Sequence, residues 1–264
     1  MAEPYLRRRN PTIKLAVALV LSIALTLVID PVTPLLVLCL TLAAGLTLGR
    51  IRLGTYARAL LPLVLVALGF VWSNAAFANV PAGSDTIAQF GPIRLTWPGL
   101  VFGLAIALRG LAIGALSVTF ILSTDPTDLV VSLVRHGRLP FRIGYALMAG
   151  LRFLPFFTAE FEQIRLAQRV RGQVESNMLP ARLKRRFSYL IPLLSSAVRR
   201  ASRVAIAMDS RGFAAVQERT YYRVVPLTWR DLMFAAACLG AMAVILATGA
   251  SGGWLRLWDG RFAA

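Results

Sequence analysis

Five apolar stretches constrain the fold of this chain more than any other feature of its sequence. They cover residues 13–29, 35–48, 59–78, 100–122 and 232–250. A helix needs about 20 apolar residues to cross a bilayer, so we predict about five transmembrane helices, the second of them the shortest. The chain is 57% hydrophobic and only 16% charged, which excludes an ordinary soluble domain. The sequence therefore predicts an all-α integral membrane protein.

The first apolar stretch follows three arginines at residues 7–9, a pattern that secretory signals share. The stretch is longer than a typical signal core. Asp30 and Pro31 follow it in place of a cleavage site with small residues. We therefore interpret it as the first transmembrane helix.

The distribution of arginine predicts the topology. Residues 135–223 hold 17 basic and 5 acidic residues and so supply most of the net charge of +17. The N-terminal segment and the loop with Arg50, Arg52 and Arg58 are also basic, whereas the linker at 79–97 is nearly uncharged. By the positive-inside rule, the N-terminus and residues 135–223 are cytoplasmic. We expect three parts: a membrane domain with four spans (1–122), a cytoplasmic coupling region (123–228), and a last span with a tail (229–264).

Two long helices are predicted within the coupling region. Residues 140–172 and 180–212 each begin with a proline, contain a second proline (Pro155 or Pro192) and end with a glycine. At 1.5 Å per residue, each helix would be nearly 50 Å long. That length suits a helix that lies along a membrane or reaches away from it.

Matching rows of residues, here called seams, run along both predicted helices. Their alternating spacing of three and four places each seam on one face of its helix. The first seam is Leu154, Phe157, Phe161, Ile164, Gln168 and Arg171, and the second is Leu194, Ala197, Ala201, Val204, Met208 and Arg211. Phenylalanines in the first seam stand opposite alanines in the second, so we predict that the helices pack through these faces.

Each seam ends at an Arg-Gly pair, and an alanine lies four residues before each arginine. The two sets are Ala167, Arg171 and Gly172, and Ala207, Arg211 and Gly212. One such pair means little, since glycine commonly ends helices and a basic residue in the last turn is stabilised by the helix dipole. Two copies in register favour a surface where a partner docks.

Several motifs of enzymes are absent. The sequence has no G-x-x-x-x-G-K-[ST], no G-x-S-x-G and no H-E-x-x-H. A second subunit must therefore bind ATP if ATP drives this protein. The acidic residues are too scattered for a catalytic pair, and His136 has no potential ligands at a suitable spacing. We expect neither catalysis nor a metal site.

Arg109 is the clear candidate for an ionisable residue near the bilayer midplane. An arginine in hydrocarbon costs several kcal/mol unless it is paired or hydrated, so such a position is often functional. The alternative is that Arg109 faces the protein interior and donates to backbone carbonyls of a neighbouring span. The sequence leaves both interpretations open.

The other basic residues of the coupling region are expected to contact anionic lipid head groups. Nucleic acid is the other common partner of such a cluster. Its position between membrane spans argues against that partner, and we expect no nucleic-acid binding.

Three stretches resemble the transmembrane coupling (T) component of energy-coupling factor transporters, in the CbiQ/EcfT family. They are "NPTIKLAVALVLSIALTLV", the stretch from "STDPTDLV" to "RLAQRVRG", and "IAMDSRGF". The family signature at two helix ends is Ala-Arg-Gly. It stands here as Val170-Arg171-Gly172 and Ser210-Arg211-Gly212.

The resemblance implies a subunit of an ATP-driven importer of vitamins or transition-metal ions. Arg171 and Arg211 would each dock in a groove on one of two cytoplasmic ABC-type ATPases, and those ATPases would bind ATP and Mg. A separate substrate-binding membrane protein, the S component, would hold the cargo. The chain itself would need no cofactor and would lie in the inner (plasma) membrane of a bacterium or archaeon, with its N-terminus in the cytoplasm.

Two other hypotheses remain. A self-contained secondary carrier would bind its substrate with polar residues in broken spans, for which Asn74 and Arg109 are the only hints. A membrane enzyme acting on lipid would need Asp209 or Glu175 as its base.

Overall fold

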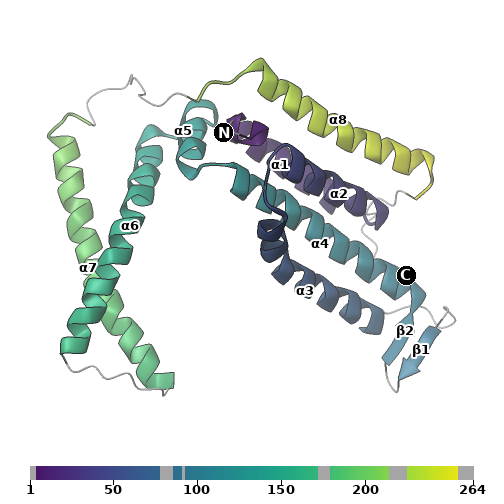
Figure 1. Cartoon of the computed structure of the whole chain (residues 1–264), viewed down its shortest axis with the longest axis horizontal. Helices are drawn as coiled ribbons and strands as arrows, with labels where there is room; N and C mark the ends of the chain where they lie inside the picture. Colours follow the sequence, from purple (N-terminus) through teal and green to yellow (C-terminus); the bar gives the residue numbers. More distant parts are fainter. Residues whose placement is uncertain (1–3, 78–85, 91–92, 172–178, 214–224, 255–264) are drawn as a thin grey trace. The chain divides into compact units, whose positions relative to one another are not determined.

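The computed structural model describes residues 4–77, 86–90, 93–171, 179–213 and 225–254 (Figure 1). The chain forms two compact units. The first unit comprises Met1–Gly137 and Val225–Ala264, and the second comprises Arg138–Val224. Nearly all described segments are helical, which confirms the predicted fold class.

The first unit contains all five predicted apolar helices. Its helices are η1 (Tyr5–Arg8), α1 (Pro11–Thr26), α2 (Val32–Thr47), α3 (Leu53–Phe77), α4 (Trp97–Ser123), α5 (Pro126–His136) and α8 (Trp229–Ser251). Among the described residues, α3, α4 and α8 are long and apolar enough to cross a membrane, whereas α1 and α2 are apolar but shorter, with 16 residues each. The prediction of a membrane protein is confirmed by this composition.

Helix α4 holds the first unit together through small side chains. Ala105, Ala112 and Ala115 are at most 1% exposed. At Gly103, a Cβ atom would lie only 3.0 Å from the Val71 carbonyl oxygen of α3. Small residues allow helix backbones to approach closely, which is how apolar helices associate in a membrane. The core beside them consists of Val17, Leu21 and Leu25 of α1, Val37 of α2, Ala112 of α4 and Met242 of α8.

A two-stranded antiparallel hairpin precedes α4 and was not predicted. Strand β1 (Thr86–Phe90) pairs with β2 (Ile93–Thr96), and Phe90 stands opposite Ile93. Both strands lie in the weakly charged linker at 79–97. The residues between the strands are Gly91 and Pro92, a turn signal that would have identified the hairpin.

The second unit is a pair of long helices, α6 (Phe141–Val170) and α7 (Leu179–Asp209), which cross each other (Figure 1). Each helix continues through its internal proline, Pro155 or Pro192. The two predicted helices are therefore confirmed to within a few residues at their ends. The expected coupling region began at residue 123, but α5 packs against α1 and groups with the first unit. Which parts lie in the membrane and which in the cytoplasm stays a prediction.

Candidate functional site

The end of α6 presents Arg171 to solvent. Arg171 caps the helix, and its backbone N–H donates to the Ala167 carbonyl at 3.2 Å. Both side chains are exposed. Gly172, the last member of this predicted site, lies outside the described residues.

The end of α7 is a Schellman motif that requires a glycine. The Phe213 N–H donates to the Met208 carbonyl at 3.1 Å, and the Gly212 N–H donates to the Asp209 carbonyl at 3.0 Å. Gly212 has φ +72°, a left-handed conformation that glycine adopts without strain. Arg211 precedes it and is exposed, as is Ala207 one turn earlier. The glycine therefore fixes the turn that follows the end of α7 at Asp209 and that contains Arg211.

Neither arginine is neutralised within the described part of the chain. Ion pairs join Arg165 to Glu162 and Arg200 to Glu160 in the second unit, but none involves Arg171 or Arg211. Val170, beside Arg171, is 90% exposed. Both helix ends thus expose a guanidinium group that has no ion pair with another described residue.

The two helices pack through an ion pair and aromatic rings. The Arg200 Nη2 atom lies 3.5 Å from the Glu160 Oε2 atom. The same guanidinium lies over the Phe153 and Phe156 rings, at 6.0 Å and 5.4 Å from their centroids. The Phe161 and Tyr189 rings meet edge to face at 5.9 Å. A charged pair flanked by aromatic rings therefore joins the middle of α6 to α7.

The residues of the predicted seams differ in how far they are buried, and packing of the helices through the two seams stays a prediction. Half-buried members are Phe157, Ile164, Gln168, Ala197, Val204 and Met208. Exposed members are Leu154, Phe161, Leu194 and Ala201, of which Phe161 still contacts Tyr189. The Glu160–Arg200 contact was not predicted, because the seams were chosen by the spacing of apolar residues, and these two residues are charged.

The arginine ends lie at opposite ends of the helix pair. Phe213, directly after α7, packs against Phe141 and Tyr145 in the first turns of α6, with ring centroids 5.7 Å and 5.0 Å apart. Arg211 is therefore near the start of α6, while Arg171 is at its end. Since α6 has 30 residues, the two arginines are separated by about 45 Å.

Large apolar side chains on both helices have no covering element. Ten of them have exposed fractions from 41% for Phe161 to 71% for Ile191, and Val170 at the end of α6 reaches 90%. Leu154, Phe156, Phe161, Leu166, Phe187, Leu190, Ile191, Leu194, Val198 and Ile206 belong to this set. Exposed apolar surface of this extent marks contact with a protein or a membrane.

A buried polar cluster ties the N-terminal segment of the first unit to α8. The Asp231 side chain accepts the Asn10 N–H at 3.2 Å and the Thr228 N–H at 2.9 Å, and it lies 3.5 Å from the Arg9 guanidinium. Asn10 also accepts a bond from Ser132 of α5 at 2.6 Å. The stretch that begins with "NP" in the sequence is thus the meeting point of α1, α5 and α8.

Arg109 donates to a backbone carbonyl of another segment, as expected if it faces the interior of the protein. One of its Nη atoms donates to the Val28 carbonyl in the turn between α1 and α2. The same turn holds Asp30, which is 3% exposed and accepts the Thr33 N–H at 2.7 Å. Arg109 therefore links the middle of α4 to the α1–α2 turn. Elsewhere, the described residues contain no group of three His, Cys, Asp or Glu side chains that could hold a metal ion.

Three of the described helices are long and apolar enough to span a bilayer, and a crossed helix pair exposes two arginines that have no ion pair with another described residue. These features define a multi-pass membrane protein with a separate unit of two long helices. The family described as CbiQ, cobalt transport protein, matches residues 3–222. The chain belongs to this family, as its resemblance to the CbiQ/EcfT proteins indicated.

Named relatives agree with this assignment. The energy-coupling factor transporter transmembrane protein EcfT of Brevibacillus brevis is 31% identical over 263 residues, which cover 96% of this chain and 95% of the relative. The Staphylococcus aureus protein of the same name is 28% identical over 235 residues, 86% of each chain. A Bifidobacterium longum protein described as an ABC transporter ATP-binding protein is 28% identical over 256 residues, 93% of this chain. This chain spans only 32% of that protein's length.

Proposed function

We propose that this chain is the transmembrane coupling (T) component of an ATP-driven importer of the energy-coupling factor type. The observation that carries the proposal is the pair of exposed, unpaired arginines at opposite ends of two crossed helices. The family match and the EcfT relatives support it. The cargo is a vitamin or a transition-metal ion that another chain binds.

Each arginine docks against acidic groups on a cytoplasmic ATPase. Arginine suits this role because its planar fork stays charged and can bond a carboxylate through two parallel hydrogen bonds. A separation of about 45 Å along α6 favours a separate ATPase subunit for each arginine, so two subunits bind one chain. These partners hold ATP and Mg, and this chain is not an enzyme. The Bifidobacterium longum relative, whose name includes ATP binding, supports a link between this segment and an ATPase.

The crossed helices carry the motion of the ATPases to the membrane. When ATP binding brings the two ATPases together, the helix ends that bind them must also approach. The Glu160–Arg200 contact and the aromatic rings around it hold the middle of the pair, so movement of the ends changes the angle between the helices. The exposed apolar side chains of α6 and α7 then act on the S component, which reorients and releases its cargo inward.

This role places the protein in the inner membrane with its N-terminus and the α6–α7 pair in the cytoplasm. The basic residues of the pair face anionic lipid and protein partners, and nucleic acid is not among them. The Arg109 contact with the α1–α2 turn favours a structural role for that residue, which weakens the main support for a self-contained carrier.

Co-purification tests the proposal. The tagged chain is isolated from membranes of its host, as wild type and with Arg171→Glu plus Arg211→Glu. The matched control is Arg152→Glu plus Arg203→Glu, which makes the same charge change at exposed positions within the same two helices.

We expect wild type and control to retain ATPase subunits and the variant with both helix ends changed to lose them, while all three remain folded in the membrane. A stable wild-type chain that retains no ATPase and transports a substrate alone would establish the secondary carrier instead. If the control variant lost the ATPase subunits equally, the loss would reflect the change in net charge of the helix pair and not the positions of Arg171 and Arg211.

A further inference from the structure

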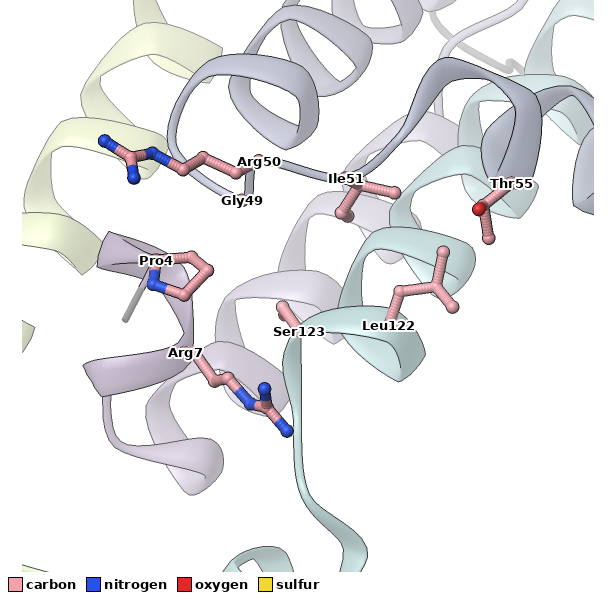
Figure 2. A pocket seen from close by; sticks show the side chains of 8 residues that line it. All are labelled: Pro4, Arg7, Gly49, Arg50, Ile51, Thr55, Leu122 and Ser123. Carbon is pink, nitrogen blue, oxygen red and sulfur yellow. The ribbon is translucent and has the colours of Figure 1, made fainter. Parts of the chain in front are cut away.

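A pocket with both polar and apolar lining residues lies in the first unit where four segments meet (Figure 2). They are η1, the loop between α2 and α3, the first turn of α3, and the end of α4. The cavity has a volume of ≈ 250 Å³. Pockets for drug-sized ligands occupy about 300–1,000 Å³. This one therefore suits a small group, such as a lipid head group, better than a large ligand.

Contacts between neighbouring segments hold the elements that line the pocket. The Leu6 N–H donates to the Leu48 carbonyl at 3.3 Å and so fixes η1 to the end of α2. The buried Lys14 ammonium donates to the Ser123 carbonyl at 2.8 Å and fixes the end of α4. At Gly49, a Cβ atom would lie 3.2 Å from the Leu6 side chain, so the chain passes η1 closely at this point. These contacts fix the positions of the segments around the cavity.

Two free positive charges stand at its rim. Arg7 and Arg50 line the pocket, both side chains are exposed, and neither has an ion pair to another described residue. Figure 2 shows Arg7, from η1, and Arg50, from the α2–α3 loop, on two sides of the cavity, with their guanidinium groups turned away from each other. Arg50 has φ +46°, a conformation that is unfavourable for a residue with a side chain. Such strain persists where the surroundings impose it, often at ligand sites.

Apolar side chains border the same opening. Leu122 lines the pocket and is 41% exposed, and Leu53, two residues before the pocket residue Thr55, is 69% exposed. Charged groups beside exposed leucines match the two parts of a phospholipid, since the phosphate meets the charges and the acyl chains meet the apolar surface. Positively charged pockets at helix ends on the cytoplasmic side are suited to anionic head groups.

We infer that this pocket binds the phosphate group of an anionic phospholipid in the cytoplasmic leaflet. Arg7 and Arg50 neutralise the phosphate, and the Thr55 hydroxyl donates a hydrogen bond to it. The site does not depend on ATPase docking, because it belongs to the first unit and uses none of the residues of α6 and α7. It does depend on the cytoplasmic orientation expected for this end of the helices.

Lipid titration of the purified full chain in a neutral detergent tests the site. Phosphatidylglycerol, phosphatidylcholine and inorganic phosphate are titrated separately, and bound lipid is counted by native mass spectrometry. The variant is Arg7→Gln plus Arg50→Gln, and the matched control is Arg52→Gln plus Arg58→Gln, which removes two exposed arginines of the same region that do not line the pocket. Thr55→Val provides a second variant that keeps the shape of the side chain.

We expect phosphatidylglycerol to bind wild type and control equally and to bind Arg7→Gln plus Arg50→Gln about 25-fold more weakly, since each basic residue contributes about fivefold at an anionic surface. Thr55→Val is expected to weaken binding at least about tenfold through one lost hydrogen bond to a charged group. Equal binding by all variants, or an equal loss in the control, would overturn the inference. Binding of inorganic phosphate without phosphatidylglycerol would show free phosphate as the ligand and overturn the lipid assignment.

Discussion

The buried Asp231 carboxylate makes a quantitative prediction about how the N-terminal segment is held. Asp231 is 2% exposed, and its partners Arg9 and Asn10 are 7% and 1% exposed. Asp231→Ala would leave the Arg9 guanidinium without its partner and the Asn10 N–H without its acceptor. Breaking a buried ion pair from one side costs about 3–5 kcal/mol. We expect a loss of that size in the free energy of unfolding, with the Thr228 N–H contributing little because Thr228 is exposed.

Equilibrium unfolding of the purified chain in mixed micelles measures this loss, and a double-mutant cycle isolates its origin. Asp209→Ala is the control, because Asp209 is exposed and surface changes of this kind stay within about 0.5 kcal/mol. Arg9→Leu combined with Asp231→Ala should be less destabilising than the sum of the single changes, by more than about 1.5 kcal/mol. An Asp231→Ala loss below about 1 kcal/mol, or additive single changes, would refute the buried ion pair.

Three further substitutions follow from the geometry. Gly212→Ala should cost about 1 kcal/mol because of the left-handed backbone, seen as faster hydrogen exchange in the last turn of α7 and not in α6. Arg109→Leu should lower stability by about 1–3 kcal/mol through the lost bond to the Val28 carbonyl while ATPase retention on co-purification stays unchanged. Gly45→Ala should cost about 1–3 kcal/mol, read as a lower melting temperature, because the new methyl group would displace the Tyr56 ring, whose hydroxyl bonds Thr119.

Features repeated locally along the chain were predictable from sequence. The apolar stretches predicted the helices of the first unit, and prolines at 140 and 180 with glycines at 172 and 212 predicted α6 and α7. Both signals depend on neighbouring residues, whose spacing reports directly on helix length and ends. The double Arg-Gly ending was visible for the same reason.

Contacts between distant parts of the chain were not predictable in this way. Asp231 meets Asn10 across 221 residues, and Arg200 meets Glu160 across 40. No periodic pattern marks such pairs, because their partners are set by how the helices pack. Arg109 stayed ambiguous for the same reason, since the carbonyl that it contacts lies on another segment. The pairing of β1 with β2 is different, because the Gly-Pro dipeptide between them in the sequence is a local signal for a turn.

Site-specific photo-cross-linking from the two helix ends tests the central claim most directly. A photoreactive amino acid replaces Arg171, Arg211 or, as the control, Arg152, and the products are identified after irradiation of native membranes. The coupling role predicts an ATPase subunit cross-linked from position 171 and from position 211, and none from position 152. Cross-links from both helix ends to lipid alone, in membranes that contain the ATPases, would contradict it.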